Sequence, residues 1–128
     1  MTRILLLVAL LASAAGAVAE TMTEAMSAYR AGEYANAARL LEPWAEQGVV
    51  QAQYTLGTLY AFGQGMAPDP SRAVRWLRAA AEQGHLEAAR ALGNIYVSGL
   101  GVPRDEAEAV KWFNKVAELA DDSSSDCD

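Results

Sequence analysis

The chain has 128 residues and one cysteine, and its 16 Asp and Glu against 10 Lys and Arg give a net charge of −6 at pH 7. Phosphate backbones and anionic lipid surfaces repel a chain this acidic, which excludes nucleic-acid binding through a basic patch. A single cysteine cannot form an internal disulfide, so packing alone must hold the fold together.

The first 19 residues have the pattern of a secretory signal peptide. Arg3 supplies a positive start, residues 4–11 are apolar, and Ala17-Val18-Ala19 is a small-residue cleavage pattern. The apolar stretch is shorter than the roughly 20 residues that a membrane helix needs. We therefore expect cleavage between Ala19 and Glu20, a mature chain without a membrane span, and a periplasmic or secreted location.

Residues 20–120 form the predicted domain, and its first unit covers about 21–48, with helices at 21–31 and 34–47. Tyr29-Arg30-Ala31-Gly32 is similar to Tyr60-Ala61-Phe62-Gly63 in the next unit, but the link that follows is shorter. An atypical unit of this kind is expected at the end of a solenoid.

The remaining sequence repeats itself with a period of 36 residues. This shift lays residues 51–84 on residues 87–120 without a gap. The matched pairs include Leu56 and Leu92, Gly57 and Gly93, Tyr60 and Tyr96, Gly63 and Gly99, Gly65 and Gly101, Asp69 and Asp105, and Trp76 and Trp112. Such internal repetition is the signature of a repeat architecture. The two repeats predict units at about 50–84 and 86–120.

Each repeat predicts two helices, which places the four helices at 50–62, 70–83, 86–98 and 106–120. Apolar residues recur at helical spacing in both halves of a repeat. Between them, Gly63 permits a positive φ that ends a helix, and Asp69 can cap the next helix, with Pro70 at its first position. Gly57 lies inside a helix at a cost of about 1 kcal/mol relative to Ala, which predicts close approach of a neighbouring helix.

Residues 121–128 have four carboxylates and no apolar periodicity, which predicts a disordered acidic tail. The tail holds Cys127, for which two interpretations stay open. Its thiol is incidental, or it forms a disulfide with another chain in an oxidising compartment.

The motif Leu-Gly-x-x-Tyr-x-x-Gly-x-Gly, followed by Asp, Ala-x-x-Trp and Ala-Glu-Gln-Gly, resembles the Sel1-like repeat, a relative of the tetratricopeptide repeat. Residues 51–86 match it nearly throughout, 87–120 match it until Glu118-Leu119-Ala120, and 22–48 look more like a tetratricopeptide unit. The resemblance implies an all-α, right-handed α/α solenoid of about three helical hairpins. It also implies a non-catalytic scaffold for a protein or peptide partner. One exported subgroup resembles β-lactamases but carries a Cys pair in each repeat, which this sequence lacks.

His85 is the only histidine, and it lies at the turn between the two repeats. A metal site needs several ligands, so we predict no metal site, no cofactor and no catalytic residue. The alternative function is a cell-wall-directed enzyme, similar to a β-lactamase or a peptidoglycan hydrolase, that uses His85. The Gly63 and Gly65 loop lacks the Lys and the Ser or Thr of a phosphate-binding loop.

We expect the first helices of successive units to line a concave partner-binding surface. The side chains off the buried stripe are then Gln53, Tyr54, Thr58 and Ala61, and 36 residues later Ala89, Arg90, Asn94 and Val97. Of these, the predicted partner contacts are Gln53, Tyr54, Thr58, Arg90, Asn94 and Val97. Two further surfaces stay open as hypotheses: a basic stripe of Arg72, Arg75 and Arg78, and a homodimer through the helix at 106–120.

Overall fold

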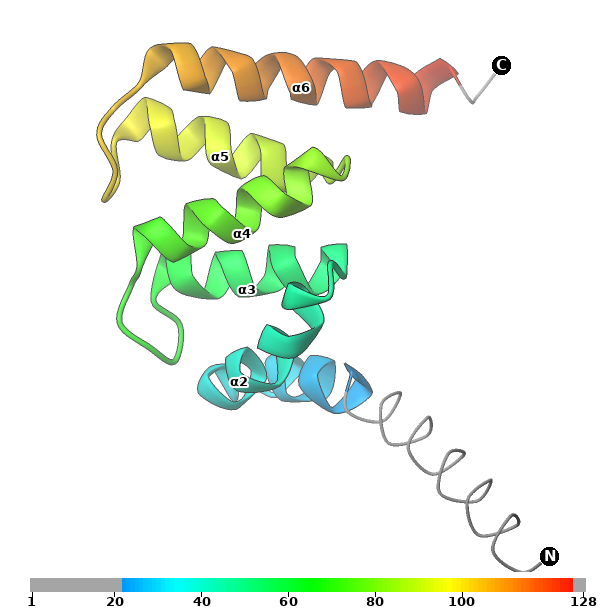
Figure 1. Cartoon of the computed structure of the whole chain (residues 1–128), viewed down its shortest axis with the longest axis vertical. Helices are drawn as coiled ribbons and strands as arrows, with labels where there is room; N and C mark the ends of the chain where they lie inside the picture. The colour runs from blue at the N-terminus through cyan, green and yellow to red at the C-terminus, as the bar shows by residue number, and fades with distance from the viewer. Residues whose placement is uncertain (1–21, 126–128) are drawn as a thin grey trace, which may run out of the picture.

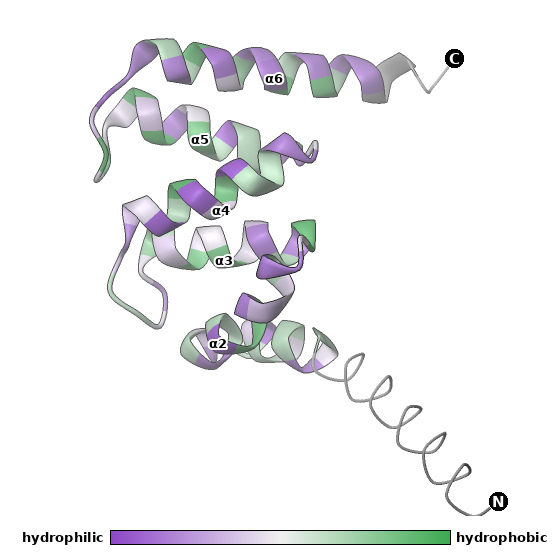
Figure 2. Ribbon diagram, in the orientation of Figure 1, coloured by the Kyte–Doolittle hydropathy of each residue, from purple (hydrophilic) through white to green (hydrophobic). Residues whose placement is uncertain are grey.

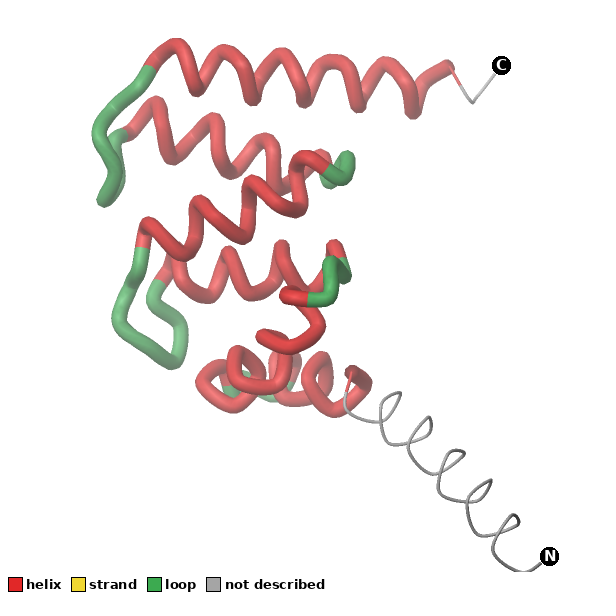
Figure 3. Tube along the Cα trace, in the orientation of Figure 1, coloured by secondary structure: helices red, strands yellow, loops and turns green. Residues whose placement is uncertain are grey.

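The computed structural model describes residues 22–125, and this part of the chain contains only helices and loops (Figure 3). Residues 22–30 are helical. They are followed by α2 (Tyr34–Glu46), α3 (Val50–Phe62), α4 (Pro70–Glu82), α5 (Leu86–Ser98) and α6 (Glu106–Ser125). The predicted all-α class and the six predicted helices are therefore confirmed.

The helices stack in chain order as a row of hairpins (Figure 1). Contacts join α2 to α3, α3 to α4, α4 to α5 and α5 to α6, so each helix packs on its neighbours in the chain. Contacts between neighbouring repeats are the defining property of a solenoid.

Local signals in the sequence set the helix ends. Gly63 and Gly99 end α3 and α5 in the left-handed conformation, at φ of 63° and 65°. The Asp69 side chain accepts a hydrogen bond from the Arg72 backbone N–H at 3.1 Å and caps α4, with Pro70 at the first position. Both repeats use the same chemistry, because the Asp105 carboxylate accepts the Glu108 N–H at the start of α6.

The helical glycines lie where the other helix of the same hairpin approaches closely, as predicted. A Cβ at Gly57 would lie 2.8 Å from the Leu77 Cγ on α4, and a Cβ at Gly93 would lie 2.6 Å from the Phe113 ring on α6. The matching contacts in both repeats show why glycine is needed there despite its low helix propensity.

Loop glycines connect one unit to the next. Gly65 packs against Tyr34 and Ala35 at the start of α2, and Gly101 packs against Pro70 at the start of α4. In each case the loop of one repeat rests on the second helix of the preceding unit. This contact explains the second glycine of each Gly-x-Gly pair.

The interior is built from small, aliphatic and aromatic side chains in two clusters. Leu41, Leu56 and Leu59 lie in the first cluster, and Leu77 and Leu92 in the second. Figure 2 shows hydrophobic and hydrophilic positions alternating along the helices, with α6 largely hydrophilic. Within the described residues, no helix is both long enough and apolar enough to span a membrane.

The structure differs from the prediction at the end of the domain. Residues 121–125, predicted to be part of a disordered tail, continue α6 to Ser125. The sequence after Ala120 contains no Gly or Pro that would end a helix, so the helix continues. The predicted signal peptide at 1–19 and Cys127 lie outside the described residues.

Candidate binding groove

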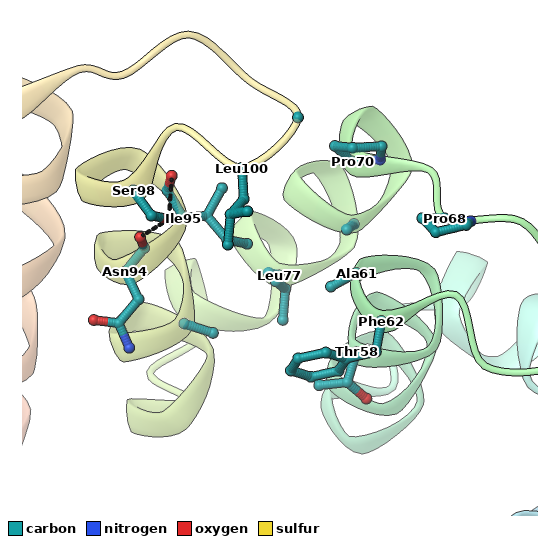
Figure 4. Close-up of a pocket in the computed structure, with 13 residues that line it drawn as sticks. Thr58, Ala61, Phe62, Pro68, Pro70, Leu77, Asn94, Ile95, Ser98 and Leu100 are labelled. Carbon is teal, nitrogen blue, oxygen red and sulfur yellow. Dashed lines mark hydrogen bonds between the residues drawn. The ribbon is translucent and has the colours of Figure 1, made fainter.

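A cavity of about 490 Å³ opens where α3, α4 and α5 meet. We call this cavity the groove (Figure 4). It is lined by Thr58, Ala61, Phe62, Pro68, Pro70, Ala73, Leu77, Ala91, Asn94, Ile95, Ser98, Leu100 and Gly101. None of these thirteen residues is charged, so the groove offers an apolar and electrically neutral surface.

Two large apolar side chains flank the groove and remain open to solvent. Phe62 is 75% exposed and Leu100 is 71% exposed. Phe62 is the last residue of α3, and Leu100 lies between Gly99 and Gly101 in the loop after α5. Figure 4 shows both side chains beside Leu77, which forms part of the lining. Adjacent exposed apolar side chains at a concavity are typical of a binding surface.

Polar side chains lie on two sides of the groove, with Thr58 on α3 and with Asn94 and Ser98 on α5 (Figure 4). The Thr58 hydroxyl donates to the Thr55 carbonyl at 2.7 Å, and the Ser98 hydroxyl donates to the Asn94 carbonyl at 2.7 Å. These hydroxyls are therefore satisfied within their own helices. The exposed side-chain amide of Asn94, on the α5 side of the groove, can bond to a partner (Figure 4).

Two of the predicted partner contacts, Thr58 and Asn94, line the groove, and Ala61 lies beside them. Arg90 and Val97 are exposed on α5 but do not line it. Arg90 forms an ion pair with Glu87, with 3.4 Å between Arg90 Nη1 and the carboxylate.

Gln53 does not lie on the open face, contrary to the expectation for this side chain. This side chain is only 5% exposed, because its amide finds partners inside the protein. Its Nε2 donates to the Ala45 carbonyl at 3.0 Å, and its Oε1 accepts from Gln83 Nε2 at 2.7 Å. A buried amide of this kind is tolerated when it is hydrogen-bonded. Ala89, also expected on the open face, is fully buried.

Tyr54 lies outside the groove, where its ring stacks on His85. The ring centroids are 4.3 Å apart and the planes differ by 24°. Burial raises the pKa of the Tyr54 phenol, and the nearby Glu87 carboxylate raises it further. Tyr54 therefore packs at the junction of two units.

His85 is the N-cap of α5, since its Nδ1 accepts the Ala88 backbone N–H at 3.1 Å. His85 therefore has a structural role as a helix cap. The alternative function, a cell-wall-directed enzyme, depends on this same residue. The described part of the chain contains no group of three or more His, Cys, Asp or Glu side chains that could hold a metal ion.

The three arginines of the basic stripe on α4 contact aromatic residues of the fold itself. Arg72 donates to the Tyr60 hydroxyl at 3.1 Å, a bond that raises the pKa of Arg72. Arg78 donates to the Tyr96 hydroxyl at 2.9 Å and so joins α4 to the next unit. The Arg75 guanidinium lies 5.0 Å from the Trp76 ring centroid.

Sequence reasoning missed Phe62, Leu100 and the rest of the apolar lining. A signal was present, because the repeat partners of Phe62 and Leu100 are Ser98 and Gln64. Both positions are polar in one repeat and large and apolar in the other. Such an exception to the repeat, next to a loop glycine, marks a side chain that the scaffold itself does not need.

The Sel1 repeat model matches residues 50–85 and 86–121, which together are more than half of the chain. The chain belongs to the Sel1 repeat family. These boundaries agree closely with the predicted units, and the motif glycines and tyrosines have the contacts described above.

The solved structures similar to this Sel1 repeat protein include the following two. A Sel1 repeat protein from Oxalobacter formigenes is 38% identical with a TM-score of 0.60, over 64% of this chain and 63% of that one. A protective antigen of uropathogenic Escherichia coli that displays an SLR fold is 34% identical with a TM-score of 0.72, over 83% of this chain and 24% of that one. This chain therefore spans less than two thirds of either relative. No curated protein matches it.

Proposed function

We propose that this Sel1 repeat protein is an exported scaffold that binds a segment of another polypeptide in the groove. The observation that carries the proposal is a neutral apolar cavity flanked by the exposed side chains of Phe62 and Leu100. Covering apolar surface contributes about 25 cal/mol per Å², and an aromatic side chain at a pocket is a common anchor of binding energy.

The walls of the groove favour a helical partner segment. Ten of the thirteen lining residues lie in helices, whose backbone groups are already paired internally, and the described part of the chain offers no strand edge to an extended peptide. An extended peptide buried there would leave its own backbone groups unpaired, which costs free energy. An amphipathic helix satisfies its own backbone and presents only apolar side chains, with Asn94 available for one polar contact.

Site-specific photocrosslinking in the native host tests this proposal. A photoreactive residue in place of Leu100 should capture a defined partner, and Phe62→Ser in the same chain should reduce that capture roughly tenfold, a loss of about 1.4 kcal/mol. Both side chains are mostly exposed, so the fold should survive the change. Circular dichroism checks this.

Arg30→Ser is the matched control, because it removes a large exposed side chain from the first unit, away from the groove. This variant should capture the partner as well as the parent chain does. Equal capture by the Phe62→Ser and Arg30→Ser variants would contradict binding in the groove.

A further inference from the structure

α6 exposes the kind of surface that α4 buries. The 36-residue period places Val110, Phe113 and Ala117 of α6 at the positions of Val74, Leu77 and Ala81 of α4. Leu77 and Ala81 are fully buried, whereas Phe113 is 37% exposed and Val110 is 56% exposed. Ala117 is also exposed. We call Val110, Phe113 and Ala117 the α6 face.

The equivalent surface of α4 is covered by a helix. α5 brings Ala88, Ala89 and Leu92 into the same buried cluster as Leu77 and Ala81. The bond from Arg78 to the Tyr96 hydroxyl holds the two helices together. A helix with small side chains therefore fits this kind of surface. In the described part of the chain, no helix follows α6 to cover its face.

The charges of α6 indicate which helix would fit. α6 carries five acidic side chains and two lysines, and the whole chain has a net charge of −6. A second copy of the chain would bring the same acidic helix against itself, and like charges oppose that pairing. A helix that flanks its apolar stripe with Lys or Arg would instead be attracted to α6.

We propose that the α6 face docks a basic amphipathic helix of another protein, which stacks on Val110, Phe113 and Ala117 as α5 stacks on α4. The occupant presents small and aliphatic residues toward α6 and basic residues at its edges. This surface is separate from the groove, and the inference does not depend on the proposed function.

A peptide based on α5 can serve as a probe for the α6 face, because α5 covers the equivalent surface of α4. A fluorescent peptide copying residues 84–101, with Glu87→Lys and Asn94→Lys at two exposed positions, keeps the α5 stripe and adds basic edges. Its anisotropy with the mature protein should report binding that weakens as salt is raised, because the edge charges are screened. A scrambled peptide of the same composition should bind at least roughly tenfold more weakly.

Two variants of the protein locate the binding. Val110→Asp places a charge in the α6 face and should weaken binding of the probe at least roughly tenfold. Phe62→Ser, in the groove, should leave that affinity unchanged. Val110 is more than half exposed, so Val110→Asp should retain the fold, which circular dichroism verifies.

The proposal is overturned if the probe does not bind, if the scrambled peptide binds equally well, or if Val110→Asp has no effect. Light scattering of the mature protein provides a further test. A dimer that Val110→Asp dissociates would identify a second copy as the occupant, contrary to the proposal. Loss of groove binding alone, with the peptide still bound at α6, would reject the proposed function but leave this inference standing.

Discussion

At the scale of single residues, equivalent positions of the two repeats perform the same task with different neighbours. Gly57 accommodates Leu77, and Gly93 accommodates the larger Phe113. Arg72 bonds to Tyr60 within its unit, whereas Tyr96 is reached by Arg78 from the preceding unit. Glu108 replaces Arg72 in the second repeat and lies 3.6 Å from Arg78, so the charge has been reversed there. The repeat thus conserves contacts between helices while the paired side chains change.

The contact between Gly57 and Leu77 leads to a prediction for Gly57→Ala, in which a gain in helix propensity opposes a steric clash. Gly57→Ala improves helix propensity by about 1 kcal/mol. The new Cβ would meet the Leu77 Cγ at 2.8 Å, and overpacking of this kind costs about 1–3 kcal/mol. We expect a net loss of unfolding free energy, measured by urea denaturation.

Leu77→Ala provides the control for that steric argument. It is destabilising by itself, because it opens a cavity beside Gly57. In the Leu77→Ala background, however, Gly57→Ala should become neutral or stabilising, since the clashing side chain is gone. The same penalty in both backgrounds would show that the contact with Leu77 is not its cause.

The cap at His85 gives a second prediction at this scale. His85→Ala should lower the unfolding free energy by about 1 kcal/mol, because the Ala88 N–H loses its acceptor. His85→Asn should recover most of the loss attributable to capping, since Asn is a favourable N-cap although it cannot stack on Tyr54. Thermal denaturation of the two variants measures the difference. Equal stability of the two would argue against a capping role.

At the scale of elements, the loop after each first helix connects neighbouring units. Gly65 and Gly101 contact the start of α2 and α4, and the Asp69 and Asp105 caps follow a few residues later. These loops therefore carry both helix-capping signals and inter-unit contacts. The groove lies beside them, and Gly101 and Leu100 belong to its lining. Substitutions in the loop should consequently affect stability and the groove together.

Gly101→Ala tests the inter-unit contact. Its φ is 75° and an added Cβ would meet the Pro70 ring. Gly48→Ala is the control, because its φ is 91° but no atom lies within 4 Å of the added Cβ. Both variants incur the backbone cost of about 1–2 kcal/mol. Only Gly101→Ala should lose more through the clash, by about 1–3 kcal/mol in urea denaturation. Equal losses would contradict a role for Gly101 in joining the units.

At the scale of the whole molecule, a linear stack has two ends and a long side, and each can meet a different partner. The groove lies on the side, between units, and the α6 face lies at the C-terminal end of the stack (Figure 1). The two surfaces also differ in chemistry, since the groove lining is uncharged and α6 is acidic. A scaffold with two such surfaces could hold two helical segments simultaneously.

The proposed export also concerns the whole molecule. Signal-peptide cleavage would determine whether the chain that meets a partner still carries residues 1–19. N-terminal sequencing of protein isolated from its native host should give Glu20 as the first residue, and fractionation should place that chain outside the cytoplasm. A cytoplasmic chain that retains residues 1–19 would contradict export.

Much of the fold followed from local sequence, because the relevant signals act over a few residues. The helix boundaries of α3, α4 and α5, the Asp69 cap and the close approach at Gly57 were all predictable from spacing and capping chemistry. The 36-residue period then required the units to stack on one another. The end of α6 was missed because acidic composition alone does not terminate a helix.

The candidate site depended on tertiary structure, because burial depends on residues distant in the chain. Gln53 looked available on its helix, yet Ala45 and Gln83 provide the hydrogen bonds that allow it to be buried. Phe62 and Leu100 are far apart in sequence and flank one groove only because α5 stacks on α4. Helical periodicity determines which residues share a stripe on one helix. Only the packing of three helices determines which stripes are covered and where an opening remains.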